Sequence, residues 1–168
     1  MTEELRNELR KRIAINTMEE LAESISRIGP YVSGLAVADV VTVSCLRYYS
    51  DARVRQKSYH QFHIPKKSGG VRTITAPDGE LKDILLTLAF ILTERYEPSE
   101  EAMAFIRGRS IVDNASRHIG RNYVLNIDLS DFFTSITAGM VEHNLVRLGI
   151  PPLVAKDYQL HQLFLHLF

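Results

Sequence analysis

Apolar residues recur at helical spacing through the N-terminal part of the chain. Two groups carry this spacing: Leu5, Leu9 and Ile13, followed by Leu21, Ile25 and Ile28. Because side chains three and four positions apart share one face of a helix, residues 2–28 are predicted to be helical. The Gly29-Pro30 pair is expected to interrupt this helix. A second helix is predicted from about Ala36 to Tyr49.

Short runs of strand-forming residues replace the helical pattern at Tyr59. The runs Tyr59–Ile64 and Val71–Thr75 flank the loop Pro65–Gly70, which ends in two glycines. A glycine-bearing loop between two β-prone runs is typical of a β-hairpin. The stretch Ala76–Gly79 contains proline, aspartate and glycine, and it is expected to form a turn after the hairpin.

Helical spacing returns in the second half of the chain, with one exception. Helices are predicted at Leu81–Tyr96, at Ser110–His118, at Thr137–Leu148 and from Leu153 onward. The exception is Tyr123–Asp128, a short apolar run that ends on a carboxylate and predicts a buried strand.

The last predicted helix carries an apolar stripe up to the final residue. The stripe consists of Leu160, Leu163, Phe164, Leu167 and Phe168. No glycine, basic last turn or polar tail follows, although helices usually end with such signals. The sequence therefore predicts either a truncated chain or one that a partner completes.

The composition narrows the classes of protein to which the chain can belong. With 45% hydrophobic and 24% charged residues, the 168-residue chain has the composition of an ordinary soluble protein. The lone Cys45 excludes an internal disulfide and a cysteine-based zinc site. The charged N-terminus lacks the apolar core of a signal peptide, and no apolar run reaches the roughly 20 residues of a membrane span. A cytoplasmic location without a membrane partner is expected.

Charge is balanced over the whole chain but not along it. The 20 basic and 20 acidic residues cancel, yet the segment from Arg53 to Lys82 holds seven basic residues against the two acids Asp78 and Glu80. The seven are Arg53, Arg55, Lys57, Lys66, Lys67, Arg72 and Lys82. A local basic segment indicates an anionic partner, although a solvated surface would give the same pattern.

Two carboxylates follow the predicted strand. Asp128 ends the run and Asp131 lies three positions later, with Phe132 and Phe133 behind it. A carboxylate at the C-terminal end of a strand lies where sites on α/β sheets collect, and carboxylate oxygens are the ligands that Mg²⁺ prefers. Capping of a short following helix would explain the same aspartates.

The loop of the predicted hairpin combines cations with glycines. Lys66 and Lys67 precede the glycines, and Arg72 lies on the returning strand. Lysine provides a point charge and arginine a bidentate fork for phosphate, while glycine lets backbone amides approach an anion. The spacing is not that of a Walker A loop. An exposed turn with solubilising charges remains the alternative.

A third motif precedes the helix predicted at Ser110. Arg107 and Arg109 flank a glycine, Ser110 can cap the helix, and Asn114 follows within it. A helix N-terminus beside two arginines can hold a phosphate. Simple capping, with Asn114 bonding locally, is the alternative.

In their order, these three motifs resemble the reverse transcriptases of bacterial retrons and their group II intron relatives. The resemblance covers residues 59–148 and consists of the basic hairpin, an apolar helix, a Phe-x-x-Gly-Arg-Ser-Ile-x-x-Asn-Ala segment and an Ile-Asp-Leu-x-Asp-Phe-Phe-x-Ser-Ile segment. It implies an α+β fold, with the fingers and a partial palm of a right-hand polymerase. The implied divisions are a helical N-terminal region at 1–57, fingers with a β-hairpin at 58–122 and a partial palm at 123–168.

The resemblance also implies roles for individual residues. Lys66, Lys67 and Arg72 would contact the incoming deoxynucleoside triphosphate, together with the backbone from Leu129 through Asp131 to Phe132. Phe133 would exclude a 2′-hydroxyl, and Asp128 would be the catalytic aspartate that binds Mg²⁺. The RNA template would be contacted by a further group of four: Arg107, Arg109, Ser110 and Asn114. The implied reaction is template-dependent deoxynucleotidyl transfer to a DNA or RNA primer by two metal ions.

The chain departs from the family after the first aspartate. The Pro-Gln-Gly loop and the Tyr-x-Asp-Asp hairpin that should follow are missing, and the chain contains no Asp-Asp dipeptide. The chain is therefore expected to be an N-terminal fragment that does not polymerise alone. It could be one piece of a split polymerase completed by the missing C-terminal portion, or a non-catalytic RNA-binding relic. An unrelated α/β protein is the third interpretation.

Overall fold

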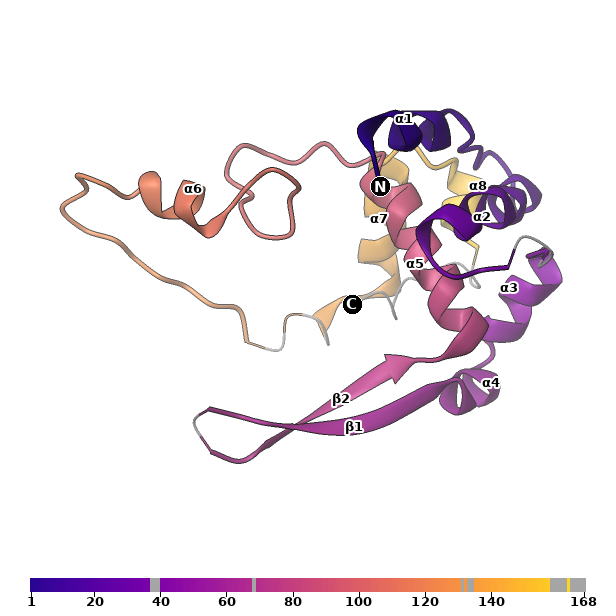
Figure 1. Ribbon diagram of the computed structural model, residues 1–168, viewed down its shortest axis with the longest axis horizontal. Helices are drawn as coiled ribbons and strands as arrows, with labels where there is room; N and C mark the ends of the chain where they lie inside the picture. Colours follow the sequence, from indigo (N-terminus) through magenta and orange to yellow (C-terminus); the bar gives the residue numbers. More distant parts are fainter. Residues whose placement is uncertain (37–39, 68, 131, 133–134, 158–162, 164–168) are drawn as a thin grey trace. The chain divides into compact units, whose positions relative to one another are not determined.

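A computed structural model describes the chain except for residues 37–39, 68, 131, 133–134, 158–162 and 164–168. The chain divides into two compact units, Met1–Arg95 with Ile136–Phe168 and, separately, Tyr96–Ser135. The first unit contains α1 (Glu3–Lys11), α2 (Met18–Val32), α3 (Val43–Ser50), α4 (Ala52–Lys57), β1 (Tyr59–Pro65), β2 (Val71–Pro77), α5 (Gly79–Thr93), α7 (Ala138–Arg147) and α8 (Pro152–Ala155) (Figure 1). The second unit contains α6 (Ile111–Ser116). The mixture of helices with a two-stranded antiparallel sheet confirms the predicted α+β class.

Side-chain caps fix where most of the longer helices begin. Threonines immediately precede four helices, and the hydroxyl of each accepts a hydrogen bond from a backbone N–H in the first turn. These residues are Thr2, Thr17, Thr42 and Thr137. Such caps satisfy N–H groups that have no partner within the helix.

Three boundary predictions in the N-terminal part are wrong. Residues 2–28 form two helices rather than one, because Thr17 caps a new helix and the hydroxyl of Ser24 bonds both the N–H and the C=O of Ala14 in the link. The Gly29-Pro30 pair does not end α2, which continues to Val32. Pro30 is tolerated there because it lies in the last turn and removes only one helical hydrogen bond. The next helix begins at Val43 rather than near Ala36.

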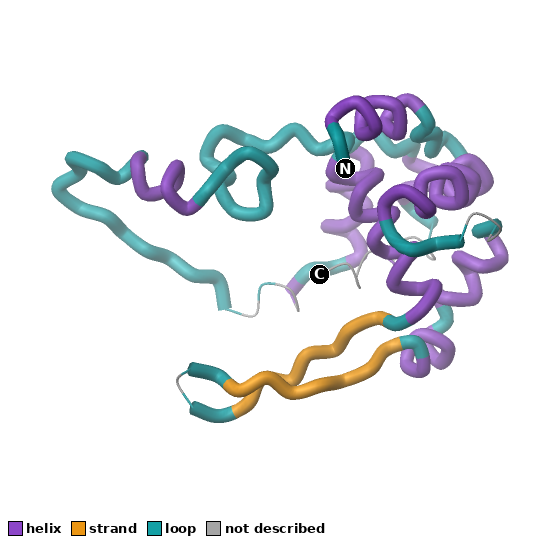
Figure 2. The backbone as a smooth tube through the Cα atoms, viewed as in Figure 1, coloured by secondary structure: helices purple, strands orange, loops and turns teal. Residues whose placement is uncertain are grey.

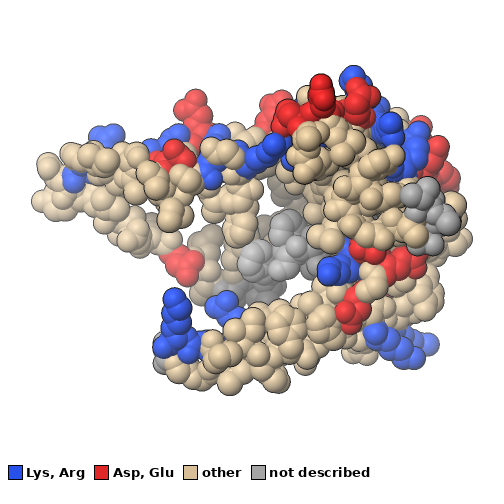
Figure 3. Space-filling model, viewed as in Figure 1, with Lys and Arg blue, Asp and Glu red and all other residues tan. Residues whose placement is uncertain are grey.

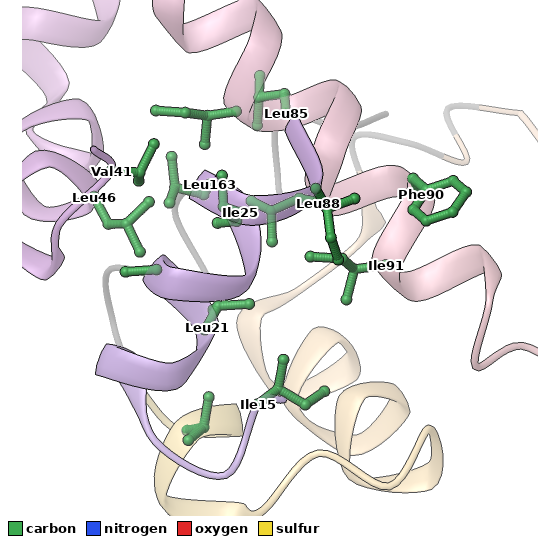
Figure 4. Close-up of a cluster of buried hydrophobic side chains, with 14 of the residues drawn as sticks. Ile15, Leu21, Ile25, Val41, Leu46, Leu85, Leu88, Phe90, Ile91 and Leu163 are labelled. Atoms are coloured by element: carbon green, nitrogen blue, oxygen red, sulfur yellow. The ribbon is translucent and has the colours of Figure 1, made fainter. Parts of the chain in front are cut away.

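The core of the first unit lies between α2 and α5, which pack against each other. Ile25, Leu88 and Ile91 are almost completely buried there (Figure 4). Leu163, from the predicted C-terminal stripe, is also buried in this cluster, whereas the other stripe residues lie outside the described part of the chain. The hairpin therefore projects from a packed helical base.

The predicted strand at Tyr123–Asp128 is not formed. Strands occur only in the hairpin among the described residues (Figure 2). A strand needs a neighbour for its backbone hydrogen bonds, and no described segment pairs with this one. Its apolar side chains are exposed instead, with Tyr123 at 94% and Leu125 at 83%.

Within the described residues, none of the helices combines the length and the apolar character that crossing a bilayer requires.

Candidate nucleotide-binding hairpin and the Asp128 segment

The hairpin confirms the strand pairing predicted from the sequence. β1 and β2 run antiparallel in a register that places Tyr59 opposite Pro77 and Pro65 opposite Val71. The loop closes with hydrogen bonds from Lys66 N–H to the Gly70 carbonyl (3.0 Å) and from Gly69 N–H to the Lys66 carbonyl (3.1 Å). Gly69 and Gly70 have φ angles of 86° and 83°, which glycine adopts without steric cost. The two glycines thus allow the tight loop that carries the lysines.

The two faces of the hairpin carry different side-chain interactions, although both include apolar residues. One face, called here the apolar face, carries His60, Phe62, Ile64, Arg72, Ile74 and Ala76. On it the rings of His60 and Phe62 stack with centroids 5.5 Å apart. The opposite face carries a cross-strand hydrogen bond between Thr73 Oγ1 and His63 Nδ1 (3.1 Å) and another from Gln61 Nε2 to Thr75 Oγ1 (3.4 Å). This alternation follows from the two-residue period of a strand.

The three predicted phosphate-binding cations gather on the apolar face at the hairpin tip. A hollow of about 420 Å³ is lined by Ile64, Pro65, Lys66, Lys67, Arg72 and Ile74. Figure 3 shows basic side chains clustered at this end of the hairpin. None of the three cations forms an ion pair with a described residue. Three cations that form no ion pair with a described residue, next to apolar side chains, could bind the phosphate group of an organic phosphate.

Asp78 and Glu80, the two acids of the basic segment, follow the hairpin in the chain, and each carboxylate contacts other side chains. The Asp78 carboxylate lies 2.6 Å from His60 Nδ1. The Glu80 carboxylate accepts hydrogen bonds from the hydroxyl of Tyr49 (2.8 Å) and the thiol of Cys45 (3.6 Å). Burial, together with the neighbouring Glu80 carboxylate, raises the pKa of the Cys45 thiol to about 11 and that of Tyr49 further still. Asp78 thus contacts β1 of the hairpin, whereas Glu80 connects α5 to α3.

In the second unit, Ser110 has the capping role that its sequence predicts. Its hydroxyl accepts a hydrogen bond from the Asp113 N–H (3.2 Å), and the Asp113 carboxylate accepts one from the Ser110 N–H (2.7 Å). The hydrogen bond from the Ser110 hydroxyl lowers the pKa of Asp113. This reciprocal capping box defines the start of α6.

The two arginines of the third motif have different surroundings. Nη1 of Arg109 donates to the carbonyls of Ser99, Glu100 and Ala102, at 2.5, 3.3 and 2.5 Å. Arg109 therefore holds the preceding loop together. Arg107 is exposed, and so is Asn114 within α6. The four predicted RNA contacts lie together around the start of α6, and their role in binding stays a prediction.

Asp128 and Leu129 lie in an exposed segment rather than at the end of a strand. Asp131 and Phe133 fall outside the described residues. No group of three or more His, Cys, Asp or Glu side chains in the described part of the chain could hold a metal ion. Asp128 by itself does not fit a two-ion site, and its role as a Mg²⁺ ligand stays a prediction.

Comparison with known proteins explains why the three motifs occur together. The chain is 41% identical over 117 residues to the retron Mx65 reverse transcriptase of Myxococcus xanthus, covering 68% of this chain and 27% of that protein. It is 38% identical over 117 residues to the retron Mx162 reverse transcriptase of the same species, covering 68% of this chain and 24% of that protein. The retron Ec86 reverse transcriptase of Escherichia coli is 34% identical over 117 residues, covering 70% of this chain and 36% of that protein.

The chain is homologous to part of a retron reverse transcriptase. This confirms the family resemblance identified from the motifs. The chain spans about a quarter to a third of the length of these retron reverse transcriptases. No family model matches the chain.

The sequence predicts the cations of the hairpin but not the contribution of their apolar neighbours. Ile64 and Ile74 line the same hollow as Arg72. The signal was present in the sequence, because residues two apart on a strand share a face. The pairing of Ile64 with Arg72 then follows from the register of the hairpin. The hollow at the hairpin tip is therefore lined by three cations and by apolar side chains.

Proposed function

We propose that the chain supplies the fingers and the first metal-binding aspartate of a retron-type RNA-directed DNA polymerase. The observation that carries the proposal is the hairpin tip, where Lys66, Lys67 and Arg72 line one hollow and form no ion pair with any residue that the structure describes. Homology to retron reverse transcriptases supports the same role. The substrates would be an RNA template, a DNA or RNA primer and deoxynucleoside triphosphates.

Each part of the hollow contributes to binding a triphosphate. The ammonium groups of Lys66 and Lys67 offer point charges, and the Arg72 guanidinium can bind two phosphate oxygens at once. Ile64 and Ile74 line the hollow beside Arg72, where their side chains offer apolar contacts to the organic part of a nucleotide. By resemblance to the family, Leu129, Asp131 and Phe133 would also contact the nucleotide, with Phe133 selecting deoxynucleotides.

The remaining assignments concern the template and the metal. Arg107, Ser110 and Asn114 would contact the RNA template, while Arg109 holds the loop that precedes them. Mg²⁺ supplies charge neutralisation in the two-ion reaction of polymerases. That reaction needs carboxylates beyond Asp128, which would come from the part of the relatives that this chain does not match.

An Arg72→Ala variant tests the proposed nucleotide site. The test protein is a chimera in which residues 59–136 replace the corresponding segment of the Mx65 reverse transcriptase. Loss of the guanidinium should raise the KM for deoxynucleotides at least tenfold, because a charge-assisted hydrogen bond contributes roughly 1.5–3 kcal/mol. Steady-state primer extension measures the KM, and a filter assay measures template affinity, which should change little.

The matched control is Thr73→Ala, whose side chain lies on the opposite face of the same strand. It should leave the KM unchanged. Equal losses of nucleotide and template binding in Arg72→Ala would identify Arg72 as a general RNA contact and contradict the nucleotide site.

A piece of a split polymerase is the second candidate, and the exposed apolar segment Tyr123–Leu129 favours it. The 168-residue chain alone should then incorporate no deoxynucleotide, and adding the remaining polymerase portion as a separate polypeptide should restore extension. Incorporation by the chain alone would contradict this candidate. RNA binding without restored extension would favour a non-catalytic relic.

A further inference from the structure

A second basic surface lies at the base of the hairpin, on α4 (Ala52–Lys57). Arg53 and Lys57 are four residues apart and therefore share one face of this helix. Both are exposed, and neither forms an ion pair with another described residue. The function proposed for the hairpin tip does not use them.

The acids nearest in sequence do not neutralise this face. The Asp51 carboxylate accepts a hydrogen bond from the backbone N–H of Arg53 (2.8 Å) rather than pairing with its guanidinium. Asp78 lies against His60, and Glu80 is bonded by Tyr49 and Cys45. Like charges four apart on a helix repel each other. An anionic partner would remove that repulsion.

The α4 surface is separate from the hollow at the tip. α4 joins β1 through a single residue, so it lies at the opposite end of the hairpin from Lys66 and Lys67. Seven residues of strand span on the order of 20 Å. Figure 3 shows basic side chains at both ends of the hairpin. A ligand that touches both ends must therefore carry negative charge along its length, as a nucleic-acid backbone does.

We propose that Arg53 and Lys57 form a second contact with RNA backbone phosphates, which holds an RNA segment alongside the hairpin from its base toward its tip. The proposal rests on the polymerase function proposed above. RNA is favoured over a membrane because binding to a bilayer needs apolar side chains beside the cations. The side chains of α4 whose burial is described include no exposed apolar one, since Val54 is half-buried.

The double variant Arg53→Gln with Lys57→Gln tests the proposal in the 168-residue chain. The probe is an RNA stem-loop with a single-stranded overhang, and its affinity is measured by fluorescence anisotropy over a series of salt concentrations. Each lost phosphate contact lowers the slope of log K against log salt by about 0.7 to 0.9. The variant should therefore bind several-fold more weakly, with a slope smaller by about 1.5.

The matched control is Lys11→Gln with Lys156→Gln, which removes two exposed lysines elsewhere in the same unit. It lowers the net charge equally but should change the slope little. Circular dichroism verifies that the variants fold.

Three results would overturn the proposal. They are an unchanged slope in the α4 variant, an equal change in the control, and no RNA binding by the wild-type chain. Unchanged RNA binding with loss of binding to phosphatidylserine vesicles would assign the surface to a membrane instead. Because the assay measures RNA affinity and not extension, its outcome is independent of whether the chimera polymerises.

Discussion

The Glu80 carboxylate governs the chemistry of two side chains on α3. It accepts hydrogen bonds from Tyr49 and Cys45, and it lies in the first turn of α5 directly after the hairpin. A thiol that is partly buried beside a carboxylate resists ionisation, because the thiolate would be both desolvated and repelled. Cys45, the only cysteine of the chain, is therefore expected to react slowly with electrophiles.

Alkylation of Cys45 by iodoacetamide should be slow and should accelerate as the pH rises toward about 11, the raised pKa of the thiol. At pH 8 its thiolate fraction would be roughly 100-fold below that of a free cysteine. Glu80→Gln removes the repelling charge and should speed the reaction, although burial keeps the rate below that of a free thiol. Mass spectrometry follows the modification. A wild-type rate equal to that of free cysteine would contradict this account.

At the scale of elements, two contacts hold the helical base of the hairpin together. The Glu94 side chain, which is fully buried just after α5, pairs with Arg6 and Arg10 of α1. Arg10 is bound through Nη2 at 2.6 Å and Nε at 2.9 Å. Elsewhere, Gly29 of α2 approaches Thr87 of α5 and Leu35 with no room for a side chain.

Replacing Glu94 with alanine should lower the free energy of unfolding by about 3 kcal/mol, because the two arginines lose their buried counter-charge. Urea denaturation measures the change. The control is Glu23→Ala, which removes an exposed pair with Arg27 at 3.7 Å and should cost no more than about 0.5 kcal/mol. Equal effects of the two variants would show that Glu94 does not anchor α1.

Gly29→Ala should destabilise the packing of the first unit by about 1–3 kcal/mol, because overpacking forces neighbours to move. The added carbon would lie 2.7 Å from Leu35 Cδ2 and 3.3 Å from Thr87 Oγ1. At Gly34 the added carbon would lie 3.5 Å from Asp83 Oδ1, an ordinary contact. Gly34→Ala is thus the control, and a thermal melt of both variants tests the difference. Similar melting temperatures would rule out a tight approach at Gly29.

At the scale of the whole molecule, the sequence correctly predicted those elements that depend on interactions between residues close together in the chain. The hairpin followed from its β-prone runs and glycines, and α5 and α7 followed from helical spacing and lie within three residues of their predicted ends. The sequence did not predict the end of α1 and the new start at Thr17, because apolar residues at helical spacing continue on both sides of the link.

The prediction of a strand at Tyr123–Asp128 was wrong for a different reason. Its apolar composition is that of a buried strand, but a strand also needs a hydrogen-bonding neighbour, which sequence spacing within the segment does not reveal. For the same reason the sequence identified Asp128 as a candidate ligand without supplying a complete site. The family was predictable because the order of three motifs carries more information than any one of them.

We propose that residues 59–136 can serve as part of a retron-type polymerase in which Asp128 is the catalytic aspartate. Primer extension with Mg²⁺ by the Mx65 chimera, compared between the parent and Asp128→Asn, tests this proposal. The parent should extend the primer, and Asp128→Asn should abolish extension while retaining RNA binding. Glu97→Gln, the control for loss of one carboxylate, should remain active. An inactive parent chimera, or extension by Asp128→Asn at the rate of the parent, would contradict the proposal.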